Sequence, residues 1–427
     1  MQDWFRPLAV SPSTGPLPGL AVGRVERLAQ YLLLLAAFTI PFSTALANLF
    51  IGLMLIAFVL ALVLDRSLVR PLATPAALLA LALLALVVIG ATWSIAPPDE
   101  VRHGLRKYTK LLVLPVAVCL CARAPDLPAR VLRWSLAGCA LLATAIYLVW
   151  LDMMPTSSLG WWRVGDPSDP YVFRNHITIG ILLSFAACAC FLLATWHRDT
   201  RARLAAVAAG IYLCAPILTG NGRTGYVGVA VGLFVVFLLR ARVTVARTAA
   251  VGAGIALLFG VVYMVSPNFK TRTDLLVAEV QAKDPTTPNG LRLSFMRAGT
   301  RAVMERPLLG YGTGSFAEVY EDEARTTLTA LPELTTMRHQ PHSEPLLLAV
   351  QLGLPGLFLY AALLGTIGKA ALARRAPGYD ALALLVAVYG IASLFNSLLW
   401  NPTEAYWFLL LAGALYAHCR QGRDAAQ

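Results

Sequence analysis

The chain is 427 residues long, with 58% hydrophobic and 14% charged residues and a formal net charge of +12. Together with a mean hydropathy of +0.67, this composition excludes a water-soluble domain with a polar surface. We therefore expect an all-α polytopic membrane protein.

Apolar runs long enough to cross the hydrocarbon core of a bilayer recur along nearly the whole chain. The fourth run is short and contains Lys110, and the last two are separated only by Trp400, Asn401 and Pro402. The N-terminus lacks the ordered parts of a signal peptide, so we expect a cytoplasmic tail there. Together the runs predict about twelve transmembrane helices, at approximately 28–45, 47–64, 72–92, 107–122, 130–151, 172–194, 203–219, 223–240, 246–266, 343–370, 379–399 and 402–419.

Lysines and arginines in short loops resist translocation and therefore predict the orientation of the chain. If both termini are cytoplasmic, in a bacterial inner membrane, every cytoplasmic loop is basic and the long polar segment 267–341 is periplasmic. We accordingly expect an N-terminal bundle of about nine helices at 1–266, a periplasmic loop domain at 267–341, and about three helices with a cytoplasmic tail at 342–427. The supporting cations are Arg66, Arg70, Arg123, Arg130, Arg133, Arg198, Arg201, Arg203, Arg240, Arg242, Arg247, Lys369, Arg374, Arg375, Arg420 and Arg423.

The long polar segment is expected to be partly helical. An amphipathic helix is predicted from Asn289 to Glu305, and we expect it to lie on the membrane surface. Its apolar side carries Leu291, Phe295, Ala298 and Ala302, roughly opposite Arg297 and Arg301. A second, acidic helix is predicted over 316–328. The glycine-rich run 310–314 predicts a backbone turn, with the alternative that its amides face an anion.

Cations also gather on the outer side, where topology does not require them. Because arginine holds phosphate through paired, planar hydrogen bonds, they indicate an anionic ligand such as a pyrophosphate at the outer leaflet. The alternative is that they neutralise nearby carboxylates or contact phospholipid phosphates. These residues are Arg102, Arg106, Lys107, Lys110, Arg163, Arg174, Arg223, Lys270, Arg272, Arg292, Arg297 and Arg301.

The sequence lacks the motifs of soluble enzymes, including a Walker loop, a dinucleotide-binding glycine pattern, a Gly-x-Ser-x-Gly elbow and His-Glu-x-x-His. The seven cysteines fall in or beside apolar runs, where we expect them to pack. His339, His342 and Glu344 lie close together, but no further clear ligand accompanies them. We expect no metal ion and no other cofactor.

Two stretches carry a more specific pattern. GNGRT at 220–224 contains Arg223 at the start of the eighth run, and in the second stretch Arg292 precedes PLLGYGTGSF at 307–316, HSEPLLL at 342–348 and LGLPGL at 352–357. Together they resemble the arginine motif and the C-terminal module shared by O-antigen ligases and O-antigen polymerases. The specific motifs occupy about 220–226 and 289–357, while the topology of the whole chain is similar.

The resemblance implies a metal-independent glycosyltransferase with a GT-C-like membrane fold. An O-antigen ligase moves the O-antigen polysaccharide from undecaprenyl diphosphate, the donor, to lipid A-core, the acceptor, and so completes lipopolysaccharide. The reaction takes place at the periplasmic face of the inner membrane, among membrane lipids, and involves no nucleic acid.

Displacing a diphosphate from an anomeric carbon requires cations for the leaving group and a base for the acceptor hydroxyl. His342 matches the family histidine at the entry to the tenth span and is the candidate base. His339 is the alternative for that role or for orienting the acceptor, and His342 can instead be a hydrogen-bonded neighbour of a helix N-cap.

Arg223 and Arg292 match the family motifs and are expected to bind the pyrophosphate, with Arg174 and Arg338 as further candidates. For a second group, contact with lipid phosphates is the alternative to contact with the donor or acceptor. This group comprises Arg102, Arg106, Lys107, Lys110 and Arg163.

Two other functions stay open. An O-antigen polymerase would use the same catalytic parts with a second polyprenyl-linked glycan as acceptor; the single large outer loop and the paired histidines favour the ligase. A lipid-linked glycan transporter would have ionisable residues near mid-membrane and internal repeats.

Overall fold

The computed structural model describes residues 20–154, 164–220, 222–241, 243–282, 287–327 and 340–424. Helices account for nearly all of its regular structure. Within these ranges the strands are β1 (Val164–Asp166) and β2 (Asp169–Val172), which pair antiparallel. The predicted all-α class is confirmed.

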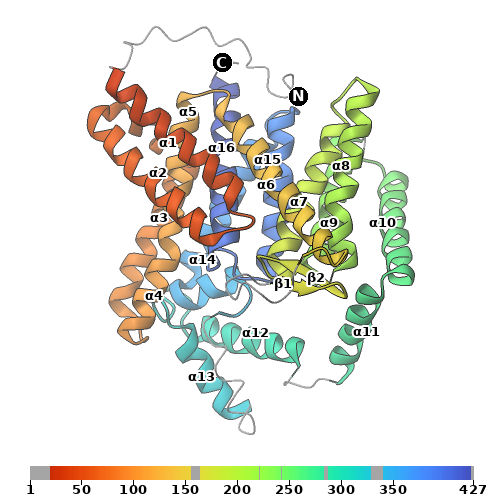
Figure 1. The fold of residues 1–427 in the computed structure, drawn as a ribbon. Coiled ribbons are helices and arrows are strands. Elements are labelled where there is room, and N and C mark those ends of the chain that lie inside the picture. The colour runs from red at the N-terminus through yellow and green to blue at the C-terminus, as the bar shows by residue number, and fades with distance from the viewer. Residues whose placement is uncertain are drawn as a thin grey trace.

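Figure 1 shows a bundle of long helices with shorter elements gathered at one end, here called the loop end. The loop end carries the sheet, α4 (Pro98–Tyr108), α11 (Pro267–Ala282), α12 (Pro288–Glu305) and α13 (Phe316–Thr327). Short 3-10 helices are η2 (Arg66–Ala73), η3 (Ala91–Trp93) and η4 (Thr109–Leu112). The bundle is formed by α1 (Leu20–Thr39), α2 (Thr44–Leu64), α3 (Pro75–Gly90), α5 (Val113–Arg123), α6 (Leu127–Trp150), α7 (His176–Ala194), α8 (Thr200–Thr219), α9 (Arg223–Arg240), α14 (Glu344–Ala371), α15 (Pro377–Leu394) and α16 (Pro402–Asp424). A further long helix is α10 (Val245–Val265).

Nine of the described helices are long and apolar enough to cross a membrane, compared with about twelve predicted spans. α1, α5 and α16 are not among them. α5 has 11 residues and is therefore only about 16 Å long, roughly half the thickness of a hydrocarbon core. α16 is buried along most of its length, so the protein surrounds it and it does not need a strongly apolar surface.

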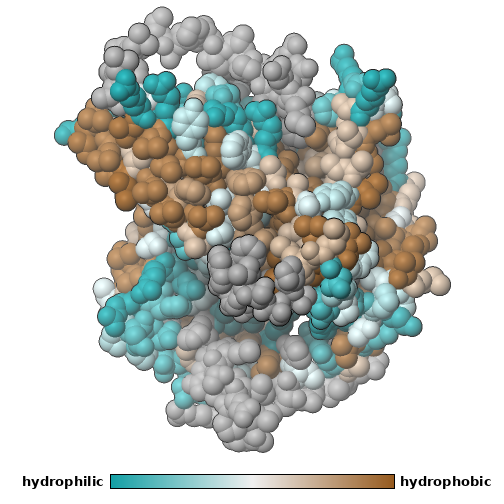
Figure 2. All heavy atoms as spheres, in the orientation of Figure 1, coloured by the Kyte–Doolittle hydropathy of each residue, from teal (hydrophilic) through white to brown (hydrophobic). Residues whose placement is uncertain are grey.

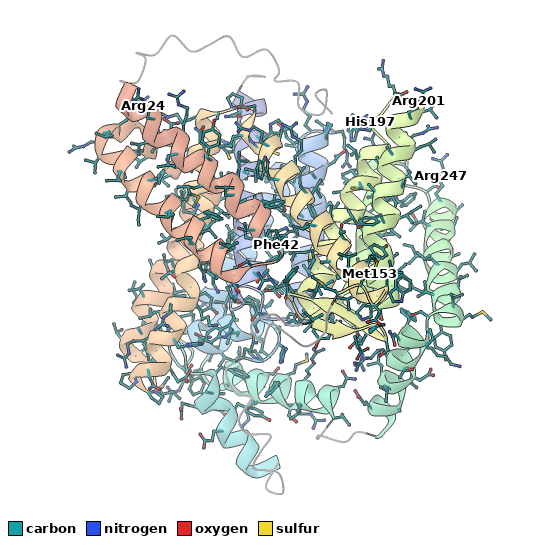
Figure 3. All side chains as sticks on the ribbon, viewed as in Figure 1. Arg24, Phe42, Met153, His197, Arg201 and Arg247 are labelled. Carbon is teal, nitrogen blue, oxygen red and sulfur yellow. The ribbon has the colours of Figure 1, made fainter. Side chains whose placement is uncertain are left out.

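The surface has the zones expected of a membrane protein. On the face shown in Figure 2, a hydrophobic belt lies between two hydrophilic zones, one at the loop end and one at the opposite end. Arg24, His197, Arg201 and Arg247 lie toward that opposite end (Figure 3), and α1 begins and α16 ends there. Arg201 and Arg247 were predicted to share the cytoplasmic side, and they do share an end; which side it faces stays a prediction.

α10 stands beside the bundle instead of inside it. None of its residues is buried, and Figure 1 shows it at the edge of the molecule. α11 follows it toward the loop end and is attached at its base by Phe269, whose ring centroid lies 4.4 Å from that of Tyr226 in α9. Asn268 Nδ2 donates to the carbonyl of Ser168 at 2.6 Å. α11 is therefore fixed at its base but packs little beyond it.

The polar segment docks onto a break in α14. Gly353 has φ +68°, and Pro355 has no N–H to donate back to the preceding turn, so carbonyls before the break are left without helical partners. Tyr311 and Gly312 donate their backbone N–H groups to two of these carbonyls, at 2.9 and 2.8 Å. The glycine-rich run is thus the predicted turn, and these amides are bonded to protein instead of facing an anion.

α12 agrees closely with the predicted helix at 289–305, but its surroundings differ from the prediction. Its apolar residues Phe295, Ala298 and Ala302 are each 3% exposed because α13 and α14 cover them. Gly299 lies so close to Leu346 that a Cβ there would be 2.8 Å from the leucine side chain. The apolar side of α12 therefore packs against protein instead of resting on lipid.

Candidate functional site

The loop end brings together polar side chains from α9, α11 and α12. Arg223 is the first residue of α9, and its Nη1 donates to Oδ1 of Asn289 in α12 at 3.0 Å. The same Nη1 lies 3.9 Å from Oε2 of Glu279 in α11. Asn289 Nδ2 donates to that carboxylate oxygen as well. One amide therefore connects a cation and an anion from two different helices.

The start of α12 places two of these residues on one side of the helix. Thr287 caps the helix, since its hydroxyl accepts from the backbone N–H of Gly290 at 3.1 Å, and Pro288 occupies the first turn. Asn289 and Arg292 are three residues apart and so lie on the same face. Burial lowers the pKa of Arg292, the charge of Arg223 lowers it further, and Glu279 partly offsets this.

Arg223 and Arg292 are thus close enough for their charges to repel. Two guanidinium groups held near each other form a site for an anion with more than one negative charge. The structure brings together these two predicted pyrophosphate residues from positions far apart in the sequence. Their role in binding remains a prediction.

His342 lies near Arg292, immediately before α14. Its φ of +53° is unusual for a residue with a side chain, and its ring centroid lies 6.1 Å from that of Phe295 in α12. Burial lowers the pKa of His342 to about 4, with a further contribution from the positive charge of Arg292. The imidazole is therefore neutral at pH 7 and can accept a proton.

Glu344 fixes the start of α14, two residues after His342. It is fully buried, its Oε1 accepts from the hydroxyl of Tyr108 at 3.2 Å, and its Oε2 accepts from the backbone N–H of Leu399 at 2.8 Å. These bonds connect α14 to α4 and to the segment between α15 and α16. Glu344 is thus well placed to hold the backbone that carries His342.

Lys110 and Arg174, two of the predicted substrate contacts, have protein partners. Lys110 is 5% exposed, and its Nζ donates to the carbonyl of Trp400 at 2.8 Å. The guanidinium of Arg174 donates to the carbonyls of Ile40 and Pro41, at 2.9 and 3.2 Å, where α1 ends. Positive charge at a helix C-terminus is stabilising. Both cations thus donate to protein carbonyls, and their contact with a substrate stays a prediction.

The remaining predicted contacts on α4 are more accessible. Arg102 and Arg106 are exposed, and Lys107 is half-buried with its Nζ 5.5 Å from the centre of the Trp400 ring. α4 thus presents a basic surface at the loop end, on different elements from the arginine pair. Three further predicted site residues lie outside the described residues, namely Arg163, Arg338 and His339.

A second histidine, His176, packs beside the turn before Arg223. His176 Nε2 lies 3.3 Å from Oδ2 of Asp169 in β2. A Cβ at Gly222 would lie only 2.7 Å from the carbonyl oxygen of His176, so the turn packs directly on the start of α7. His176, Glu279 and Asn289 were not predicted as site residues, because their roles depend on contacts that only the fold brings about.

The site contains two guanidinium groups that can hold a multiply charged anion and a neutral imidazole that can take a proton. Among the described residues, no group of three or more histidine, cysteine, aspartate or glutamate side chains could hold a metal ion. The fold and the site define a helical, polytopic membrane protein with a basic, histidine-containing site at one end of its bundle.

Residues 207–361 match the family model described as O-antigen ligase, which confirms the predicted resemblance to that family. The matched region includes α9, α11 and α12, which carry Arg223, Glu279 and Arg292, and it also includes His342 and the first part of α14. That family comprises membrane ligases and polymerases of the glycosyltransferase type. No curated protein matches the chain.

Proposed function

We propose that the protein is an O-antigen ligase of the bacterial inner membrane, with its loop end in the periplasm. It transfers O-antigen polysaccharide from undecaprenyl diphosphate to a sugar hydroxyl of lipid A-core. The observation that carries the proposal is the convergence of Arg223, Arg292 and His342, which come from three separate elements of the region that matches the family.

The reaction needs one proton transfer and one displacement. His342 accepts the proton of the acceptor hydroxyl, and the acceptor oxygen forms a bond to the anomeric carbon of the glycan. The bond between that carbon and the diphosphate oxygen breaks, and undecaprenyl diphosphate leaves with the electron pair. The imidazole is unprotonated at pH 7, as a base must be before it acts, although its lowered pKa makes it a weaker base than an ordinary histidine.

Arg223 and Arg292 stabilise the negative charge that develops on the leaving diphosphate. Guanidinium groups that are already held in place need little reorganisation during the reaction, and this is the main source of electrostatic catalysis. Since the two arginines supply this positive charge, the proposal requires no metal ion. Arg102, Arg106 and Lys107 on α4 are proposed to contact the anionic head of the donor or acceptor, and Arg163, Arg338 and His339 keep their predicted roles in the proposal.

A reconstituted transfer assay tests this function. Purified protein in lipid nanodiscs is mixed with undecaprenyl-diphosphate-linked glycan, lipid A-core and a chelator, and products are separated by size. We expect transfer by the wild type in the presence of chelator and a loss of at least 100-fold in His342→Ala. His197→Ala is the matched control, because His197 lies toward the opposite end of the bundle (Figure 3).

Three outcomes would count against the proposal. Full activity in His342→Ala would show that His342 is not the base. Loss of transfer in the presence of chelator would show that the reaction needs a metal ion. Glycan lengthening in the absence of lipid A-core would instead identify a polymerase, which shares the donor site but not the acceptor.

A further inference from the structure

Glu279 has no role in the proposed mechanism, although it lies beside both arginines. Its side chain is 13% exposed, compared with 27% for Arg223, so the carboxylate is largely withdrawn from water. Burying a carboxylate is costly unless cations or hydrogen bonds offset the loss of water. Here the offset comes from Arg223, Arg292 and the amide of Asn289.

The contact between Glu279 and Arg223 is a loose one. Their nearest atoms are 3.9 Å apart, too far for a hydrogen bond, and the direct bonds of both groups are made to Asn289 instead. Arg292 makes no hydrogen bond to another described residue. Within the described part of the chain, donor groups of the arginine pair are thus left for a ligand even while Glu279 neutralises part of the pair's charge.

The helix that carries Glu279 is also lightly attached. α11 is fixed at its base by Phe269, while Glu279 lies near its other end. α10, which leads into α11, has no buried residue. Little packing therefore opposes a small movement of Glu279 away from the arginines.

We propose that Glu279 is the internal counter-ion of the Arg223–Arg292 pair, displaced when the diphosphate of the donor binds, and that it keeps singly charged phosphates from occupying the pair. This inference rests on the proposed function. A carboxylate and a phosphate compete for the same guanidinium donors, and displacing Glu279 costs the same free energy for every incoming anion. A diphosphate gains enough from two arginines to offset that cost.

A phospholipid phosphodiester carries a single negative charge and gains much less. Such lipids greatly outnumber any polyprenyl donor in a membrane, so an arginine pair without a counter-ion would be occupied by them. Because the cost is the same for every anion, Glu279 leaves the ratio of their affinities unchanged, but it raises the concentration at which each anion occupies the arginine pair, so that phospholipids leave the pair empty. Its role is distinct from catalysis, since it touches neither the reacting carbon nor the acceptor.

The test compares Glu279→Gln with the wild type and with Asp274→Asn. Glutamine keeps the size of the side chain and an oxygen that can accept from Asn289. Asp274 is on the same helix, and Asp274→Asn removes the same negative charge. Its Oδ1 accepts from the hydroxyl of Tyr263 in α10 at 2.7 Å, so it is not bonded to the arginine pair. The first measurement is the affinity of each purified protein for inorganic pyrophosphate.

We expect Glu279→Gln to bind pyrophosphate about tenfold more tightly than the wild type, which corresponds to about 1.4 kcal/mol. Asp274→Asn should stay within twofold. In nanodiscs, adding phosphatidylglycerol should raise the KM for the donor in Glu279→Gln but not in the wild type, while kcat changes little. A residue that only held α11 in place would produce neither effect.

Equal or weaker pyrophosphate binding by Glu279→Gln would overturn the inference while leaving the proposed function intact. Tighter binding of pyrophosphate by Asp274→Asn would also overturn the inference, because the effect would then come from any loss of negative charge on α11. If the wild type and all variants fail to bind pyrophosphate, the arginine pair is not the diphosphate site, and the proposed function fails together with the inference.

Discussion

The acid–base behaviour of His342 gives the sharpest prediction. Its pKa is lowered from 6.5 to about 4, first by burial and then by Arg292. At 1.36 kcal/mol per unit, this corresponds to a cost of about 3 kcal/mol for placing a proton on the folded imidazole. We therefore predict that His342 stays neutral down to about pH 4, so that transfer activity loses its base only when the pH falls through that value.

Nuclear magnetic resonance of protein labelled with ¹⁵N-histidine measures this directly, and His342→Gln identifies the signal. We expect a titration midpoint near pH 4 in the wild type. In Arg292→Gln the midpoint should rise but stay below 6.5, because burial is the larger cause of the shift. A wild-type midpoint near 6.5, or one that Arg292→Gln leaves unchanged, would refute the reasoning.

The same shift has a consequence for stability whose sign is fixed. Between pH 6.5 and about 4 the unfolded chain binds a proton at this histidine and the folded protein does not. The free energy of unfolding should therefore fall as the pH is lowered through this window. The fall should be smaller in His342→Gln, measured as the pH dependence of the thermal midpoint in detergent.

Three other substitutions test residues that stabilise the fold and that we do not expect to bind the diphosphate. Lys110→Met should lower stability by about 1–3 kcal/mol, because the buried carbonyl of Trp400 loses its donor, and leave pyrophosphate affinity unchanged; a large loss of affinity would contradict this. Arg174→Ala should lower the thermal midpoint in the same way and keep pyrophosphate affinity within twofold, since the guanidinium bonds carbonyls at the end of α1. Gly353→Ala should cost at least about 1–2 kcal/mol, because φ is +68° and a Cβ would lie 2.5 Å from the carbonyl carbon of Leu308; faster hydrogen exchange in 307–312 should accompany it, and wild-type exchange there would count against the docking described above.

The elements of the polar segment could be predicted because their signals are local. α12 begins near Asn289 because a threonine cap and a proline precede it, and its apolar residues recur at helical spacing. What covers those residues could not be predicted, since an apolar side chain such as Phe295 suits lipid and protein equally well. In the structure these residues pack on α13 and α14, and contact of α12 with the membrane surface stays a prediction.

Residues of the candidate site could be predicted where a sequence motif contains them. Residues that belong to the site only through tertiary contacts could not be predicted. Arg223, Arg292 and His342 were found through a resemblance to a family, and the fold brings them close together. Glu279 was missed because α11 carries no motif and its partner lies in α9. The carbonyl partners of Lys110 and Arg174 could not be predicted, because they are backbone atoms, which any residue can supply.

A double-mutant cycle on the transfer reaction tests the central claim most directly, that Arg223 and Arg292 hold one diphosphate. The quantity is kcat/KM for the polyprenyl-diphosphate donor in the wild type, Arg223→Ala, Arg292→Ala and the double variant, with folding checked by thermal midpoint. The account predicts that each single variant loses at least 100-fold and that the double variant loses far less than the product of the two factors, because groups that act as a unit are not additive. Losses that multiply would place the two arginines at independent sites and contradict the account.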